Sequence, residues 1–428
     1  MSESIGPVKS SSLRLLHVAE AFGGGVFEMV RLLAEESVNA GHEVAIAYGQ
    51  RPETPADVPS RFSPAVTLMQ TAWVQRSLGA QLRTARQLRD FVAEWQPDVI
   101  HLHSSFAGAL GAFALGSATP IVYSPHGYSF EMRDYSRVRR AAFRAIETIV
   151  ARRVTLVGAV SLDEAELVRA KLRHAHVAVV QNGIPELDAP VRPRRRSRRP
   201  PLAVTMGRVS PQRQPDACAR ILREVRDLVE PRWIGGVRPG SPHAAGLRAA
   251  AIPVTGWISR DDALEHLDQA EVYLHWTAWD GQPLSVLEAM ARDVIVVAHD
   301  IPPLRELLDP RQLCQTESDA AALIRRLITQ PALKEELLAD QRTRAELFGR
   351  ARMVDSWHRV YRELDRAPPD VLDRSPVRVP DPSIVGVLDR SLVREFDGAT
   401  ALDRIGASTR PFAAEASLLG SREGACLP

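Results

Sequence analysis

The sequence has few cysteines, few lysines and no apolar segment near its first residue. Its 3 cysteines are odd in number and have no metal-ligand spacing, so we expect reduced thiols. No signal region of charged and apolar residues opens the chain, which favours a cytoplasmic protein. The basic residues are nearly all arginine, a bias that we attribute to the genome composition of a bacterium rather than to function.

Membrane spans and nucleic acid partners also lack support. The uncharged run from Ser104 to Pro125 has membrane-spanning length, but glycines and Pro120 divide it into a helix, a turn and a strand. We therefore expect no transmembrane helix. The formal net charge of +2 at pH 7 gives no reason to expect nucleic acid as a partner. Hydrophobic content of 45% and charged content of 25% are typical of a soluble globular protein.

Strand-like and helix-like segments alternate in both halves of the chain. Such alternation predicts an α/β fold with parallel, doubly wound sheets. The length of 428 residues suits two domains, which we place at 12–185 and 202–349. The strands expected in the first domain are at 13–18, 43–48, 99–103, 121–124, 155–160 and 177–180.

Three other segments differ from the predicted domains in composition. Residues 186–201 are rich in proline and arginine, which is typical of an interdomain linker. Residues 350–366 form a predicted helix, in which Trp357 and Tyr361 share one face at i, i+4 spacing. Residues 367–428 combine proline with loose polarity, so we expect a loosely ordered tail.

The segment from His275 to Glu306 is the most informative part of the sequence. It predicts a strand, a loop, a helix and a strand, with Asp280 in the loop and Glu288 inside the helix. The N-terminus of such a helix lies at the carboxyl ends of parallel strands, where unpaired N–H groups attract phosphate. Two acids beside an anion site suit a ligand with phosphates and many hydroxyl groups, such as a nucleotide sugar. A helix-cap acid is the simpler interpretation of Asp280, but it does not explain Glu288.

The spacing of these two acids resembles the E-x7-E region of the retaining family 4 glycosyltransferases of the GT-B fold. Asp280 stands where the family has glutamate, and Gln282 and Pro283 replace a Phe-Gly pair. The resemblance implies that Asp280 contacts the hydroxyl groups of the transferred sugar and that Glu288 contacts the ribose. It also implies that backbone N–H groups near the start of the helix hold the diphosphate. The donor-binding residues implied here are Asp280, Gly281, Gln282, Pro283, Leu284, Ser285 and Glu288.

A second segment, Gly207 to Asp216, is similar to the family's GR-x-S-x-x-K-G-x-D motif. Arg208 and Arg213 lie on a loop between a predicted strand and a helix, where two cations can clamp a diphosphate. Arg208 matches the family's residue, whereas Arg213 stands where the family has lysine. The alternative is a pair of solvated arginines. By the resemblance, Arg208 binds the donor and also has a catalytic role in stabilising the departing diphosphate.

A glycine loop follows the first predicted strand of the chain. Its three glycines, at 23–25, let the backbone approach an anion closely, although a tight turn alone is the simpler interpretation. The resemblance implies that Gly24 and Gly25 lie at the donor phosphates. It places Gly23 on the acceptor side.

Histidines end or follow two strands of the first domain. His126 lies in a loop where the family has a histidine near the reacting carbon, so the resemblance implies a catalytic role through hydrogen bonds to the donor sugar. A packed histidine is the alternative. We expect His103 to line the acceptor side at the end of its strand. His101 shares a strand face with His103, but no third ligand stands at a plausible spacing, so we expect no metal.

The segment from Arg133 to Arg153 contains seven arginines, with Phe143 and Ile146 among them. Related enzymes that act on lipid-linked acceptors use such a surface to rest on anionic membrane, here the inner face. A solvated charged face is the alternative.

The resemblance covers about Leu13 to Arg366 and implies two Rossmann-like domains facing across a cleft, with the helix at 350–366 crossing back onto the first domain. It implies transfer of a hexose, with retention, from a nucleoside diphosphate sugar to a hydroxyl of a glycan, lipid-linked or small-molecule acceptor. Arginines and N–H groups would take the role of a divalent ion, so no metal or cofactor is expected. The alternatives are a nucleotide-sugar epimerase on the same fold and a non-catalytic binding or scaffold protein.

Overall fold

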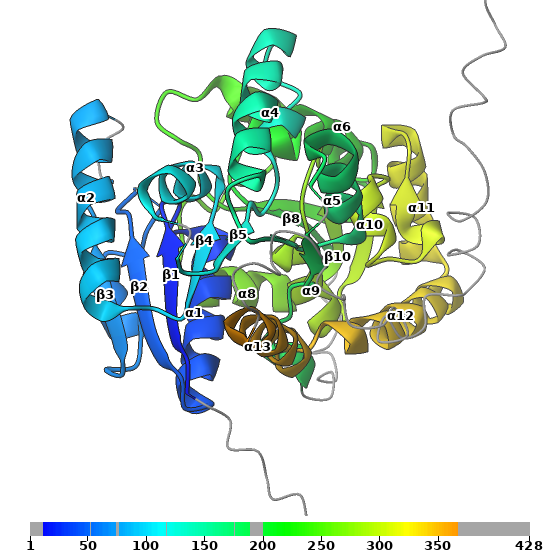
Figure 1. Ribbon diagram of the computed structural model, residues 1–428. Helices are drawn as coiled ribbons and strands as arrows, with labels where there is room; N and C mark the ends of the chain where they lie inside the picture. The colour runs from blue at the N-terminus through cyan, green and yellow to red at the C-terminus, as the bar shows by residue number, and fades with distance from the viewer. Residues whose placement is uncertain are drawn as a thin grey trace, which may run out of the picture. The chain divides into compact units, whose positions relative to one another are not determined.

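The computed structural model contains two parallel β-sheets with helices between their strands (Figure 1). It describes residues 12–51, 53–73, 77–116, 118–174, 176–188 and 200–366. The first sheet has the strand order β3-β2-β1-β4-β5-β6-β7, and the second has the order β12-β11-β10-β8-β9. All strand pairs in these sheets are parallel. The predicted α/β fold is therefore confirmed. Most of the predicted linker, at 189–199, and the predicted tail at 367–428 lie outside the described residues.

The first sheet is built around buried strands with helices between them. One of its strands, β3, was not predicted, because it lies at the sheet edge and only Val66 of its five residues is buried. Its strands are β1 (Arg14–Ala19), β2 (Glu43–Tyr48), β3 (Val66–Gln70), β4 (Val99–His103), β5 (Ile121–Ser124), β6 (Leu156–Ala159) and β7 (Val177–Val179). Its helices are α1 (Gly24–Asn39), α2 (Leu78–Trp95), α3 (Ser105–Ala114), α4 (Arg137–Ala151) and α5 (Leu162–Leu167).

The second sheet follows the same alternation. Its central strand β10 is buried at every position, which fits a parallel strand covered on both faces. Its strands are β8 (Leu202–Met206), β9 (Glu230–Ile234), β10 (Ala270–His275), β11 (Ile295–His299) and β12 (Leu313–Cys314). The helices that follow are α6 (Pro215–Glu224), α7 (Ala245–Ala249), α8 (Arg260–Asp268), α9 (Leu284–Ala291), α10 (Pro302–Arg305), α11 (Glu317–Thr329) and α12 (Pro331–Ala345). Across the described ranges, no helix has the length and apolar character needed to cross a bilayer.

The last helix, α13 (Arg350–Arg366), packs against the first sheet although it follows the second in sequence. Trp357 and Tyr361 are both buried in a cluster with residues of β1, β4 and α1. The Tyr361 hydroxyl lies 2.8 Å from Nδ1 of His101 on β4. Two aromatic side chains at i, i+4 thus anchor the end of the described chain to its beginning.

The contact between α13 and β6 depends on a glycine. A Cβ atom at Gly158 would lie 2.4 Å from the Trp357 ring and 2.7 Å from the Ser124 hydroxyl oxygen. We predict that Gly158→Ala lowers the free energy of unfolding by about 1–3 kcal/mol, because the added methyl group overpacks this interface. Urea unfolding measures the change. Gly116→Ala is the matched control, since its Cβ would meet nothing within 4 Å; equal stability of the two variants would contradict the prediction.

Candidate active site

Asp280 lies in the loop between β10 and α9 and is held by two partners. Its Oδ2 accepts a hydrogen bond from Nη1 of Arg213 at 2.8 Å and lies 3.3 Å from Nε2 of His275. Burial raises the pKa of Asp280, but the Arg213 charge and the His275 contact outweigh it and lower the pKa below its usual value. Burial and Arg213 lower the pKa of His275 to about 4. Asp280 is therefore an ionised carboxylate beside a neutral histidine and a cation.

Arg213 and Asp280 were predicted at separate motifs, and the structure brings them together. Arg213 follows β8 and Asp280 follows β10, and these strands are neighbours in the second sheet. The backbone N–H of Ala278 donates to the carbonyl of Gln212 at 2.8 Å, which ties the two loops to each other. Because the carboxyl ends of parallel strands meet at one sheet edge, residues 67 positions apart share one site.

Glu288 lies one turn into α9 and is buried. Its Oε1 accepts a hydrogen bond from Nη2 of Arg260 at 2.7 Å, and Arg260 also lies 3.6 Å from Glu186. Burial raises the pKa of Glu288, and the charges of Arg260 and Arg292 oppose this rise. The sequence reasoning missed Arg260, which is the first residue of α8 and belongs to no motif.

The other predicted residues at the start of α9 use their side chains for local support. The Gln282 side chain accepts a hydrogen bond from the backbone N–H of Asn182, and the Gln282 backbone carbonyl accepts one from the Asn182 side chain at 3.1 Å. Pro283 is the N-cap residue of α9 and Leu284 begins the helix. The Ser285 hydroxyl accepts a hydrogen bond from Tyr273 at 2.8 Å. An anion at this helix end would therefore meet backbone N–H groups rather than these side chains.

The glycine loop and the His126 loop of the first domain reach the same region. Gly23 caps α1, and Gly24 begins the helix with a φ of 57°. A Cβ at Gly25 would touch Leu284 at 3.5 Å, and one at Gly281 would lie 3.4 Å from the Gly127 nitrogen. The structure therefore brings together the predicted glycines of the first domain and the predicted loop of the second.

The carboxylate of Glu164, on α5 of the first domain, holds the His126 loop. It accepts hydrogen bonds from the backbone N–H groups of Gly127 at 3.0 Å and Val160 at 2.8 Å. Burial raises the pKa of Glu164 to about 7, although these two hydrogen bonds oppose the rise. His126 has a φ of 54° and Gly127 a φ of 99°, so the loop has a left-handed turn that Glu164 stabilises. This role of Glu164 was missed in the sequence analysis.

His126 is the outer member of a chain of histidines. Its Nε2 lies 3.1 Å from Nδ1 of His103, whose Nε2 lies 3.0 Å from Nδ1 of His17 on β1. Burial lowers the pKa of His126 to about 4 and that of His17 to about 3, and it lowers the pKa of His103 well below 6.5. Each neutral imidazole carries one donor and one acceptor, so the tautomers of the three rings are coupled. His103 thus lies behind His126 rather than separately on the acceptor side.

The free end of this chain favours one set of tautomers. His17 Nε2 is buried without a hydrogen-bond partner. Buried N–H groups without a partner are rarer than buried acceptors without one, so Nε2 is favoured as the acceptor and Nδ1 as the donor to His103. His103 then donates from Nδ1 to Nε2 of His126. This leaves His126 with a proton on Nδ1, available as a donor to a ligand.

The histidines also bear on the expectation that no metal binds. His17 supplies a third histidine: one ring nitrogen from each of His17, His101 and His103 lies within 4.8 Å of the others. The reason given from sequence, that no third ligand stands at a plausible spacing, was therefore wrong. However, His101 Nδ1 contacts Tyr361 at 2.8 Å and its Nε2 contacts Ser124 at 2.9 Å. A metal ion would have to break these hydrogen bonds, and those between the other histidines. The group fits a hydrogen-bonded core better than a metal site.

Glu53 was also missed by the sequence reasoning. It lies in the loop after β2, and its Oε1 accepts a hydrogen bond from Nη1 of Arg208 at 3.1 Å. Arg208 thus points to a carboxylate in the structure, as Arg213 does. The pair links the predicted diphosphate-binding arginine to the first domain.

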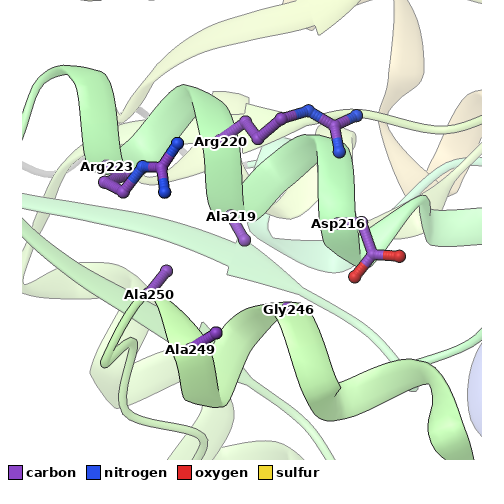
Figure 2. A pocket seen from close by; sticks show the side chains of 7 residues that line it. All are labelled: Asp216, Ala219, Arg220, Arg223, Gly246, Ala249 and Ala250. Atoms are coloured by element: carbon purple, nitrogen blue, oxygen red, sulfur yellow. The ribbon is translucent and has the colours of Figure 1, made fainter.

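A separate hollow lies on the second domain, between α6 and α7 (Figure 2). Its cavity volume is about 210 Å³, below the roughly 300–1,000 Å³ of sites for drug-sized ligands. None of the predicted site residues lines it. The lining residues are Asp216, Ala219, Arg220, Arg223, Gly246, Ala249 and Ala250.

Two family profiles match the chain in succession. Residues 23–186 match the profile Glycosyltransferase Family 4, and residues 200–330 match the profile Glycosyl transferases group 1. An uncharacterised 41.2 kDa protein in a cps region of Klebsiella pneumoniae is 24% identical over 317 residues, which cover 69% of this chain and 83% of that protein.

Solved structures share the fold at low sequence identity. Sucrose-phosphate synthase from Thermosynechococcus elongatus has a TM-score of 0.69 and 16% identity, covering 82% of this chain and 99% of that one. The Anabaena protein Alr3699/HepE in complex with UDP and glucose has a TM-score of 0.66 and 15% identity, covering 81% and 99%. The apo form of the lipopolysaccharide outer core galactosyltransferase WaaB has a TM-score of 0.59 and 15% identity, covering 81% and 98%.

The pKa of about 4 for His126 has a testable consequence. An exposed histidine titrates near pH 6.5, so we predict that the His126 Cε1–H resonance does not shift between pH 8 and 5.5. Between about pH 6.5 and 4 the unfolded chain binds a proton at His126 that the folded chain does not, so the contribution of His126 to stability falls as the pH drops through this range. NMR of protein labelled at histidine measures the chemical shift of this resonance against pH, and the variant His126→Asn identifies it. A titration midpoint above pH 6 would contradict the prediction.

Proposed function

Because the chain belongs to the family 4 glycosyltransferases of the GT-B fold, we propose that it transfers a hexose from a nucleoside diphosphate sugar to a hydroxyl group, with retention of anomeric configuration. The observation that carries this proposal is the ionised Asp280 held by Arg213 at the N-terminus of α9. A carboxylate accepts hydrogen bonds from sugar hydroxyls, and the cation and the helix N-terminus attract phosphate. A nucleotide sugar carries both hydroxyl groups and phosphates, so this one ligand would pair with the carboxylate, the cation and the helix N-terminus.

The residues then divide the work by their chemistry. Arg208 and Arg213 stabilise the negative charge that grows on the diphosphate as its bond to the sugar's anomeric carbon breaks. Asp280 holds sugar hydroxyls and Glu288 holds the ribose. The Nδ1–H of His126 donates to the sugar near the reacting carbon. The acceptor oxygen forms the new bond on the face that the diphosphate leaves, and its proton passes to a phosphate oxygen, so no separate base is needed.

Two observations guide the choice of substrate. The Anabaena structure holds UDP and glucose, so UDP-glucose is the first donor to test. The Klebsiella relative lies in a cps region, which supports a glycan or lipid-linked acceptor and a role in polysaccharide biosynthesis. An epimerase would convert the donor without an acceptor, and a scaffold protein would bind no nucleotide.

Donor hydrolysis in the presence of EDTA tests the proposal. We predict that the protein releases nucleotide from one member of a panel of UDP-, GDP- and ADP-sugars without a metal ion, because arginines and helix N–H groups neutralise the diphosphate. Arg208→Ala should lower this rate by about 100-fold, which is typical of losing one charge-stabilising group. Arg220→Ala is the control, since Arg220 pairs with Glu317 on the surface. Epimerised donor without free nucleotide would contradict the proposal, as would a rate restored only by Mg²⁺.

The surface of α4 supports contact with anionic membrane as part of the same function. Side chains on α4 and α3 expose apolar groups, with Val138 81% exposed, Ile146 45% and Phe113 51%. The Arg153 guanidinium lies 4.3 Å from the centre of the Phe113 ring. Exposed apolar side chains among arginines suit the boundary between lipid headgroups and acyl chains.

Vesicle sedimentation tests this membrane contact. We predict binding to vesicles of phosphatidylcholine with 30% phosphatidylglycerol and much weaker binding to phosphatidylcholine alone. Arg137→Gln with Arg144→Gln should lower the affinity about thirtyfold, at roughly 1 kcal/mol for each charge. Arg220→Gln with Arg325→Gln removes the same charge from the second domain as a control. Equal binding of both double variants would show a solvated face instead.

A further inference from the structure

We propose that Arg238 is a third arginine of the diphosphate site, and that the carboxylate of Glu53 occupies Arg208 and Arg238 until the donor diphosphate displaces it. This inference rests on the proposed function, because it is the predicted role of Arg208 that identifies the ligand as a diphosphate. It adds a binding residue outside both family motifs and an internal competitor from the first domain.

One oxygen atom of Glu53 receives both arginines. Oε1 accepts from Nη1 of Arg208 at 3.1 Å and from Nη2 of Arg238 at 2.6 Å. The two guanidinium groups therefore converge on a point that suits a negatively charged oxygen. Burial raises the pKa of Glu53, but the hydrogen bond from Arg238 and the charges of both arginines outweigh it and lower the pKa. The carboxylate is thus ionised at neutral pH.

Backbone contacts fix the position of Arg238 beside Arg208. The loops that carry them follow the adjacent parallel strands β9 and β8, which pair up to Ile234 and Met206. The N–H of Gly207 donates to the Ile234 carbonyl at 2.8 Å, and that of Val209 donates to the Gly236 carbonyl at 3.0 Å. These bonds extend the ladder beyond the strands to Gly236, and Val209 forms a parallel bridge with Val237, the residue before Arg238.

A glycine makes this close approach of the two loops possible. Gly235 has a φ of 135°, and a Cβ there would lie 2.3 Å from the Gly207 carbonyl oxygen. Any other residue would push the two loops apart. The close approach of the two loops that carry Arg208 and Arg238 is therefore built into the backbone and does not depend on Glu53.

The guanidinium groups of Arg208 and Arg238 both lie within 3.1 Å of one Glu53 oxygen, so they repel each other when no anion lies between them. Burial and the charge of Arg238 both lower the pKa of Arg208, while Glu53 opposes them. An anion is therefore stabilising at this point, and Glu53 supplies one from the chain itself. A diphosphate carries more charge and more acceptor oxygens than a carboxylate, so it binds the same arginines more strongly.

The loop of Glu53 also lies against the glycine loop. A Cβ at Gly23 would lie 2.7 Å from the Glu53 carbonyl oxygen. Arg51 in the same loop donates to Glu20 at the end of β1, at 3.1 Å from its Nε. Phosphates bound at Arg208 would thus meet the Glu53 carboxylate, and two anions cannot share one oxygen position. Donor binding would release Glu53 and change the contact between this loop and the second domain.

The proposal makes two predictions of opposite sign. Arg238→Gln should weaken the binding of UDP and of inorganic pyrophosphate about tenfold, because one charge-assisted contact is lost. Glu53→Gln should strengthen both about tenfold, because the competing charge is removed while the side chain keeps its size. Isothermal titration calorimetry of the full chain measures the two dissociation constants. The Arg238 side chain is 58% exposed, so Arg238→Gln should keep the wild-type melting temperature. Glu53→Gln removes the anion between two arginines and should lower the melting temperature by a few degrees while the protein stays folded, which a thermal melt of both variants checks.

Matched controls separate this inference from the proposed function. Arg248→Gln removes an exposed arginine from α7, and Glu317→Gln removes a surface carboxylate that also pairs with an arginine. Neither should change binding by more than about twofold. Arg208→Gln tests the diphosphate site itself and should strongly weaken the binding of both UDP and pyrophosphate.

Each outcome decides one of the two proposals. Loss of binding in Arg208→Gln, with Arg238→Gln unchanged or Glu53→Gln weaker than wild type, would overturn the inference and leave the diphosphate site intact. Unchanged binding in Arg208→Gln, or no binding of either ligand to the wild type, would overturn both. Weaker binding in Arg238→Gln together with tighter binding in Glu53→Gln would support the inference.

Discussion

The ion pair between Arg213 and Asp280 is the interaction on which the second-domain site depends. The two side chains are 18% and 14% exposed, and a charge at that depth without a partner costs several kcal/mol by order of magnitude. The pair joins the loop after β8 to the loop after β10, and His275 on β10 contacts both side chains. The Arg213–Asp280 ion pair therefore fixes the positions of these two loops relative to each other. The same groups are those that would receive the sugar and the diphosphate.

The first sheet supplies polar groups in a different way, through a row of neutral histidines. His17 on β1 and His103 on β4 lie on adjacent parallel strands and continue to His126 through hydrogen bonds. Burial keeps these three histidines neutral. The row of histidines therefore presents one oriented N–H donor, Nδ1 of His126, and no positive charge. Glu164 orients the same loop through backbone N–H groups. Under the proposed function, the site would offer fixed charge to the diphosphate and a neutral donor to the sugar.

Local patterns allowed most of the fold to be predicted, and they failed where structure depends on distant contacts. The strands with long apolar runs were predicted, whereas β3, with one buried residue at a sheet edge, was not. Asp280 and Glu288 could be predicted as site residues because their spacing lies within one strand–loop–helix unit. Arg260, Glu53 and Arg238 were missed because each is distant in sequence from its partner. The third histidine was missed for the same reason: His17 reaches His101 and His103 only through the pairing of β1 with β4.

The departures from the family motif also have partners in the structure, and this bears on whether the protein is an enzyme or a scaffold. Asp280 is shorter than glutamate, but Arg213 and His275 fix its carboxylate, and Gln282 replaces an apolar residue yet binds Asn182 through side chain and backbone. A buried ion pair adds little stability compared with apolar residues of the same volume. A scaffold would therefore gain nothing from a cation, a carboxylate and a helix N-terminus held together. A site for a ligand that is both charged and rich in hydroxyl groups requires all three, which favours the enzyme.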